Sequence, residues 1–179
     1  MAGATRPALA TARAAERRSA AHPAGFDGRP AAKLIDCRVA EDSREVRDAQ
    51  DLRVRVFCRE QGVPRDSELD GRDADAIHIV ALDSELVIAT CRLTFEPSGF
   101  RLGRMAVEAD RRREGVGAAL LDAAEAEASR WGGREVILHA QRVVEGFYGA
   151  ADYVAEGGTF LEEGIEHVLM RKELQGPGA

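Results

Sequence analysis

The sequence predicts a single α/β domain built around one mixed sheet. The chain has 179 residues, which is enough for one domain with a substantial core and too few for two domains of ordinary size. Apolar residues make up 45% of the chain and charged residues 31%, which is the balance of a globular protein. Strand-like and helix-like segments also alternate along most of its length. This alternation is typical of folds in which helices cover a central sheet.

Both ends of the chain are expected to lie outside this domain. Residues 1–33 are rich in Ala and Arg and poor in large apolar side chains, so they cannot bury enough surface to fold alone. They lack the compact apolar stretch of a secretory signal, although their Arg-rich composition leaves a transit peptide open. We therefore expect a disordered N-terminal tail at 1–33, the folded domain at 34–174 and a flexible C-terminal tail at 175–179.

The first half of the domain is expected to contain one strand, one helix, a long loop and a hairpin. In chain order these are the strand 33–40, the helix 41–61, the loop 62–75 and the strands 76–82 and 86–95. The helix repeats apolar side chains three and four positions apart, and Asp42 with Glu45 forms an approximate capping box at its start. The loop is unusually long, and long ordered loops are often functional. The two strands are β-branched and joined by a short polar turn, which predicts an antiparallel hairpin.

The second half is expected to continue the alternation. In chain order it holds the strand 100–107, the helix 115–131, the strand 134–140, a short helix at 143–153 and a closing strand at 166–174. The long helix is Ala-rich, and a pair of glycines ends it. The strand that follows is too apolar for a sheet edge, so we expect it to be buried and parallel to a neighbour.

Charge and cysteine usage exclude several classes of function. The net charge of −6 argues against a nucleic-acid binder, because affinity for phosphate backbones comes from an excess of Lys and Arg. No apolar run approaches the roughly 20 residues that cross a bilayer. Cys37, Cys58 and Cys91 are odd in number and never arranged as C-x-x-C, so neither a disulfide framework nor a metal site is indicated. We expect a soluble, cytoplasmic protein without metal, nucleic-acid or membrane partners.

The stretch DRRREGVGAALL, residues 110–121, places three arginines directly before two glycines that open a helix. A helix start presents free backbone N–H groups and the positive end of the helix dipole, so it binds anions. Gly115 and Gly117 let a phosphate approach the main chain, and the arginines add charge-assisted hydrogen bonds. A diphosphate is the expected ligand. The chain has no Gly-Lys-Ser/Thr for a P-loop, and Leu120 stands where a Rossmann fingerprint needs a small residue.

These residues resemble the GNAT superfamily of N-acetyltransferases. Its diphosphate signature, Q/R-x-x-G-x-G/A after a central strand, is matched by Arg112, Gly115 and Gly117 after RMAV. GFYGAADY resembles the family's F-Y-x-x-x-G-F/Y pattern, with Ala151 in place of the usual glycine. LRVRVFCREQGVPRDSELDGRD and FLEEGIEHVLMRK further resemble the ElaA-like subgroup. The likeness spans roughly residues 34–173.

The resemblance implies a GNAT-like domain that uses acetyl-CoA as co-substrate. Its central sheet would be mixed and mostly antiparallel, flanked by helices, with a splayed parallel strand pair in the middle. Main-chain groups at 105–107 would pair with the pantetheine arm, N–H groups at 113–118 would hold the diphosphate, and Gln141 would replace the usual asparagine. The cofactor-binding residues implied are Met105, Ala106, Val107, Arg112, Arg113, Glu114, Gly115, Val116, Gly117, Ala118, Gln141 and Tyr148.

The expected reaction is transfer of an acetyl group to a primary amine by direct attack in a ternary complex. Tyr148, which the resemblance places near the thioester sulfur, is the expected general acid, and the N–H of Val107 the expected oxyanion donor. Glu60, at the end of the first helix beside the long loop, is the expected base. Its rivals are Asp70, His78 and His139. Cys58 and Cys91 have no local base beside them, so we expect both to pack rather than to carry an acyl group.

The acceptor is expected to be a small cationic amine or an amino-acid-like molecule, because the loop 62–75 is acidic and would attract it. The acidic residues of the loop are Asp66, Glu68, Asp70, Asp73 and Asp75. The alternative function is a non-catalytic acyl-CoA sensor or interaction module on the same fold. A distant relationship to acyl-homoserine-lactone synthases ranks last, since only RVRVF suggests it. A homodimer is left open.

Overall fold

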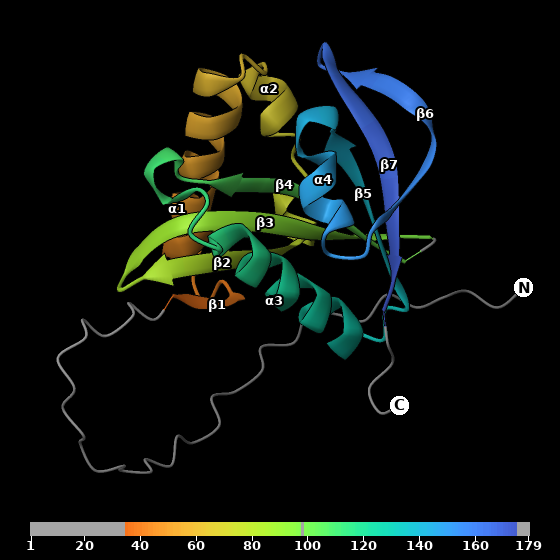
Figure 1. Ribbon diagram of the computed structural model, residues 1–179. Coiled ribbons are helices and arrows are strands. Elements are labelled where there is room, and N and C mark those ends of the chain that lie inside the picture. Colours follow the sequence, from red (N-terminus) through yellow and green to blue (C-terminus); the bar gives the residue numbers. More distant parts are fainter. Residues whose placement is uncertain (1–34, 98, 175–179) are drawn as a thin grey trace, which may run out of the picture. The chain divides into compact units, whose positions relative to one another are not determined.

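A seven-stranded mixed sheet organises the protein (Figure 1). The structure is a computed structural model and describes residues 35–97 and 99–174, so the tails predicted at 1–33 and 175–179 lie outside the described residues. Across the sheet the strands run β1-β2-β3-β4-β5-β7-β6, and only β4 and β5 are parallel. The strands are β1 (Asp36–Val39), β2 (Ile77–Asp83), β3 (Leu86–Glu96), β4 (Gly99–Val107), β5 (Glu135–Gln141), β6 (Val154–Glu162) and β7 (Ile165–Glu173).

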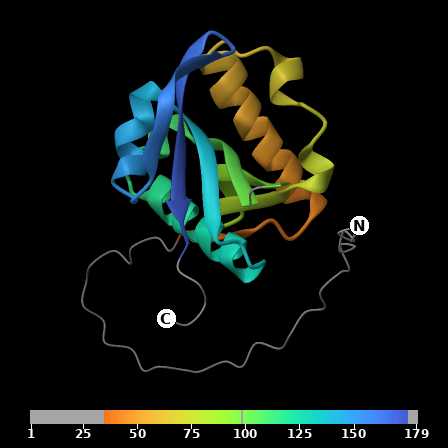
Figure 2. The same ribbon diagram turned by 90° about the vertical axis from the view of Figure 1, so that its right-hand side faces the viewer.

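Helices cover both faces of this sheet. α1 packs on β2, β3 and β4 from one side, and α3 crosses β1 to β4 on the other side (Figures 1 and 2). The α-helices are α1 (Ser43–Arg53), α2 (Arg65–Glu68), α3 (Val116–Arg130) and α4 (Glu145–Gly149). A π-helix, η1 (Val54–Glu60), continues α1, and three short 3₁₀ turns are η2 (Asp73–Asp75), η3 (Ala109–Arg111) and η4 (Arg142–Val144). The predicted α/β class with a mostly antiparallel sheet is confirmed.

The start of α1 follows from the predicted capping residues. The Asp42 carboxylate accepts hydrogen bonds from the N–H groups of Arg44 and Glu45, at 2.8 and 2.9 Å. Glu45 reaches back to the N–H of Glu41 at 2.7 Å, one residue earlier than a standard capping box. The single helix predicted at 41–61 is wrong in its second half, because the chain winds as a π-helix from Val54. Such wide turns are rare and concentrate near functional sites.

α3 is held by a continuous apolar stripe and two glycine-dependent turns. Its buried residues Leu120, Leu121 and Ala124 join the larger core cluster under the sheet. Gly115 precedes the helix with φ +82°, a conformation that favours glycine. At the other end, a Cβ on Gly133 would lie 2.6 Å from the Phe100 ring, so only glycine fits the turn into β5. α3 therefore begins where β4 ends and returns the chain to β5.

The parallel strands β4 and β5 separate after a short contact. They pair only where Phe100–Leu102 face Val136–Leu138, and β4 continues from Gly103 to Val107 without pairing with β5. On its other edge β4 carries one extra residue against β3, and Arg104 in this bulge has φ +54°. The predicted splayed strand pair is thus present, and a bulge lies just before Met105.

The strand β6 was not predicted from the sequence. A single closing strand was expected at 166–174, whereas the chain forms a hairpin of β6 and β7. β6 reads VAEGGTFLE, which lacks apolar alternation and contains two glycines. It is the edge strand, most of its residues are exposed, and its pairing shifts register between Glu156 and Phe160. An exposed edge strand has little hydrophobic pattern to detect.

Candidate functional site

The predicted anion site lies in the turn between β4 and α3, residues 108–115, which we call the anion turn. Gly115 caps α3 without a side-chain hydrogen bond, so no capping side chain competes for the first N–H groups of the helix in the described chain. Arg113 also has a positive φ, +66°, which folds the turn tightly. A Cβ on Gly117 would meet Phe147 at 3.5 Å, which is ordinary contact. The main chain at the helix start is therefore open to an anion.

The three arginines of this turn have different partners. Arg111 bonds to Asp83 at 2.6 Å and to Glu114 at 2.9 Å. Arg112 donates to a Glu60 carboxylate oxygen at 2.7 Å and to the carbonyl of Val107 at 3.0 Å. Arg113 is exposed, and none of the described carboxylates pairs with it. Only Arg113 can meet an incoming diphosphate without first exchanging a partner.

Unpaired main chain of β4 leads up to this turn. Glu108 donates its N–H to Ile88 on β3 at 2.9 Å, and successive N–H groups of a strand point to opposite sides. The N–H of Val107 therefore points away from β3, toward the side where β5 has separated. The carbonyl of Val107 points the same way, which agrees with its bond from Arg112. This is the geometry that an extended pantetheine arm would pair with.

Tyr148 lies against the same strand. Its side chain is buried in α4, and its hydroxyl donates to the Met105 sulfur at 3.3 Å. A thioether is a weak acceptor, so this bond is readily exchanged for a stronger one. Burial raises the pKa of the Tyr148 hydroxyl well above its usual value. The group therefore stays protonated at neutral pH and can donate a proton there.

Gln141 is the last residue of β5, and Glu60 is the last residue of η1. The amide of Gln141 donates to the side-chain oxygen of Gln61 at 2.8 Å. Gln61 directly follows Glu60. The end of η1 is thus bonded to β5 through Gln61 and to the anion turn through Glu60.

The acidic loop is neutralised by arginines, which overturns its predicted role as an attractive rim. Arg53 bonds to Glu68 and, at 2.9 Å, to Asp73. Arg92 bonds to Asp70 at 2.7 Å and Asp73 at 2.8 Å, while Arg104 bonds to Glu68 at 2.8 Å and Asp70 at 3.3 Å. We name these six side chains the loop clamp. The three arginines of the loop clamp neutralise its three carboxylates. The clamp therefore holds the loop in place and does not attract a cationic substrate.

The environment of each clamp carboxylate sets its protonation. Arg92 lowers the pKa of Asp70 to about 2. Burial opposes ionisation of Asp73, but bonds from Arg53 and Arg92 outweigh it and hold the pKa below its usual range. Burial raises the pKa of Glu68 despite the nearby Arg53. Because Asp70 is engaged with Arg92, it is a poor candidate for the base.

The two histidine rivals, His78 and His139, and the further histidine His167 occupy different environments. His78 is buried, its Nε2 lies 3.0 Å from the Asp73 carbonyl, and burial lowers its pKa. His167 is also buried, with Nδ1 2.8 Å from the Ile165 carbonyl. His139 is partly exposed and lies between Glu162 and Arg101. Glu162 could not be predicted as a neighbour of His139, because it lies on β6, a strand that the sequence did not indicate.

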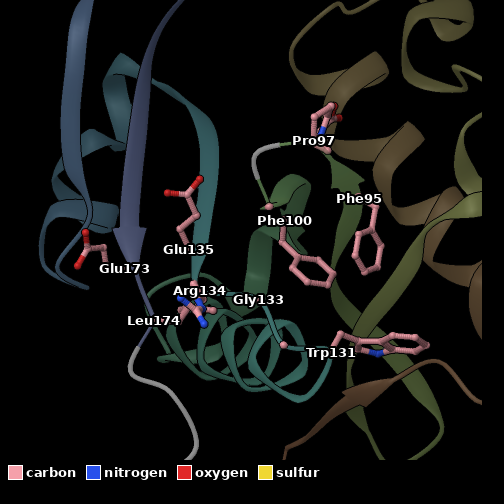
Figure 3. A pocket seen from close by; sticks show the side chains of 12 residues that line it. Phe95, Pro97, Phe100, Trp131, Gly133, Arg134, Glu135, Glu173 and Leu174 are labelled. Atoms are coloured by element: carbon pink, nitrogen blue, oxygen red, sulfur yellow. The ribbon is translucent and has the colours of Figure 1, made fainter. Parts of the chain in front are cut away.

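A separate hollow lies away from these residues. It has a volume of about 940 Å³ and is lined by Phe95 and Trp131 among others, near the start of β4 (Figure 3). β4 runs from there to the anion turn, roughly 25 Å at about 3.3 Å per residue. The predicted site residues do not line it. Within the described ranges, no helix is long and apolar enough to span a bilayer, and no three side chains form a metal-binding group.

Comparisons with known proteins agree with this geometry. A family described as acetyltransferase (GNAT) domain matches residues 45–174. The uncharacterized N-acetyltransferase YjcF of Bacillus subtilis is 32% identical over 136 residues, covering 75% of this chain and 97% of the relative. An acyl-CoA N-acyltransferase structure from Pseudomonas aeruginosa has a TM-score of 0.70 at 28% identity, covering 78% of this chain and 99% of that one. Escherichia coli ElaA has a TM-score of 0.70 at 24% identity, covering 78% and 100%.

Proposed function

This chain belongs to the GNAT family of acetyltransferases, and we propose that it transfers an acetyl group from acetyl-CoA to a primary amine of a small molecule. Transfer would occur by direct attack in a ternary complex. One arrangement supports this most directly. Free main chain at the end of β4, the buried hydroxyl of Tyr148 and the open start of α3 follow one another along a single path.

The residues present fit acetyl-CoA along that path. When bound, it supplies an acetyl group activated as a thioester. The stretch Met105–Val107 would pair with the pantetheine arm through those main-chain groups, such as the N–H and carbonyl of Val107, that point away from β3 and that β5 leaves free. The N–H groups from Arg113 to Ala118 would hold the diphosphate, helped by the free guanidinium of Arg113.

The reaction joins the amine nitrogen to the acetyl carbon and breaks the carbon–sulfur bond. Val107 and Tyr148 would stabilise the negative charge that develops on the carbonyl oxygen and on the departing sulfur. The N–H of Val107 stabilises the oxyanion. Tyr148 gives its proton to the departing sulfur and regains one from the nitrogen. A protonated amine loses two protons in all, so the products are the amide, the CoA thiol and one released proton.

Glu60 is the base predicted from the sequence, and its bond to Arg112 allows a direct test. Its carboxylate is bonded to Arg112 at 2.7 Å, at the diphosphate end of β4, and must leave Arg112 in order to take a proton. In Glu60→Gln, loss of kcat at unchanged affinity for acetyl-CoA would identify a base. A change in acetyl-CoA affinity at unchanged kcat would identify a residue that only holds Arg112.

A thiol-release assay tests the proposed function. The purified protein is given acetyl-CoA with an alkylamine, an arylalkylamine, a diamine, an amino acid and an aminoglycoside in turn. We expect release of free CoA thiol that depends on one or more of these amines. Tight acetyl-CoA binding without turnover on any amine would instead support the sensor function.

A further inference from the structure

A histidine, a glutamate and an arginine meet on one face of the sheet. Nδ1 of His139 lies 2.5 Å from a carboxylate oxygen of Glu162, the last residue of β6. Arg101 on β4 approaches the same nitrogen to 2.7 Å and lies 3.7 Å from the Glu162 carboxylate. Three strands, β4, β5 and β6, thus bring these side chains into one cluster.

The cluster lies where β4 and β5 separate. Leu138, directly before His139, forms the last pair between these strands, with Leu102. Leu138 and Ala140 belong to the core on the α3 face, so the side chain of His139 points to the opposite face. Tyr148 belongs to the α3-side core. Figure 2 shows α3 and α4 on one side of the strands and α1 with α2 on the other. The proposed acid and His139 therefore flank the strand separation from opposite faces.

The partners of Nδ1 determine which imidazole nitrogen is free. A carboxylate only accepts hydrogen bonds and a guanidinium only donates them. Glu162 and Arg101 therefore favour opposite tautomers of His139. The Glu162 carboxylate is the closer of the two, at 2.5 Å against 2.7 Å, so our inference places the proton on Nδ1, donated to that carboxylate. Nε2 then carries a lone pair, and no bond to it is found within residues 35–97 and 99–174. The His139 side chain is 23% exposed, so the ring is not sealed from solvent.

Resting on the proposed acetyltransferase function, we propose that Nε2 of His139 is the base that takes a proton from the acceptor ammonium. Glu162 is a positioning residue, which holds Nδ1–H and stabilises the imidazolium that forms. Arg101 opposes that charge and so favours return of the proton to water. His167 is a further titratable group near the cluster. Its ring stacks on Phe160, and the ring centroids of Phe160 and His139 lie 4.7 Å apart.

Kinetics of two variants test this role. With an amine that the wild-type protein acetylates, His139→Gln should lower kcat by roughly 10²- to 10³-fold at unchanged acetyl-CoA affinity. Glu162→Gln should cause a smaller loss of kcat. Glu166→Gln, which changes an exposed carboxylate on β7, is the matched control and should retain wild-type turnover. Added imidazole should restore part of the activity of His139→Gly, which a merely structural role would not allow.

A spectroscopic measurement gives a readout besides turnover. Nitrogen NMR of ¹⁵N-histidine-labelled protein should find His139 with its proton on Nδ1 and a free Nε2. A proton on Nε2 in the resting protein, or full kcat in His139→Gln, would overturn the inference while leaving the acetyltransferase function intact. Absence of wild-type turnover with every amine would instead refute the proposed function, and the base assignment with it.

Discussion

Tyr148 carries the clearest chemical assignment at the scale of single residues. Its ring is buried, and its hydroxyl meets only the weak Met105 sulfur among the described residues. A buried hydroxyl with a weak partner is readily redirected to a better acceptor such as a thiolate. The family pattern in the sequence predicted the residue, whereas its contact with Met105 required the fold.

Replacing Tyr148 by phenylalanine should separate chemistry from binding. Tyr148→Phe removes the donor and keeps the ring, so the packing against Tyr153 and Phe147 should survive. We expect kcat to fall by about 10²-fold with little change in the Kd of acetyl-CoA. Steady-state kinetics and calorimetry measure the two quantities. Unchanged turnover would remove Tyr148 from the mechanism.

The pH dependence of kcat tests the same hydroxyl without mutation. An acid works in its protonated form, and burial raises the pKa of Tyr148. The ordinary pKa of a tyrosine hydroxyl is about 10. Activity should therefore persist as pH rises past this value and should fall only above it. A profile of kcat at saturating substrates, corrected for thioester hydrolysis, records this. An alkaline limb starting near pH 8 would show that Tyr148 is not the limiting acid or that its pKa is not raised.

At the scale of elements, the loop clamp explains how a loop of polar composition acquires a fixed position. Arg104 sits in the β4 bulge with positive φ and donates to the carbonyl of Ser67 at 2.7 Å. Arg53 is completely buried and bonds to the buried Glu68. The loop is therefore attached to α1 and β4 by ion pairs that lie wholly or partly inside the protein, and such pairs stabilise a specific arrangement only when every partner is present.

Breaking the clamp should destabilise the protein. Glu68→Gln leaves the Arg53 guanidinium buried beside a neutral amide, and we expect a loss of about 3 kcal/mol in the free energy of unfolding. Asp66→Asn changes an exposed carboxylate of the same loop and should alter it by less than about 0.5 kcal/mol. Urea unfolding of both variants measures the difference. Equal stability of the two would show that the clamp contributes nothing.

Patterns that lie within one element could be read from the sequence, and partnerships between elements could not. The apolar periods of α1 and α3 and the glycines at the start of α3 are local, so they were predicted. The acidic loop also looked simple locally, yet its charge is cancelled by Arg53 and Arg92, which lie on α1 and β3. The partner of His139 was missed for the same reason, because β6 is an exposed edge with little apolar pattern.

At the scale of the whole molecule, the splay of β4 and β5 organises everything that we propose. It frees the main chain at Val107, and it separates two faces with Tyr148 on one and His139 on the other. The same strand delivers the chain into the anion turn at Gly115. Binding of the diphosphate at that turn is the central claim. It would fix the position of acetyl-CoA, and thereby place the pantetheine arm along β4 and the thioester near Tyr148.

Calorimetric titration of acetyl-CoA into the wild-type protein, Gly117→Ala and Gly117→Glu tests that claim most directly. A methyl group at position 117 makes only ordinary contacts, and the family signature accepts alanine there, so Gly117→Ala should still bind. Gly117→Glu places a bulky carboxylate among the N–H groups that would hold the diphosphate, and its binding heat should disappear. Equal affinity of all three proteins, or no heat with the wild-type protein, would contradict the account.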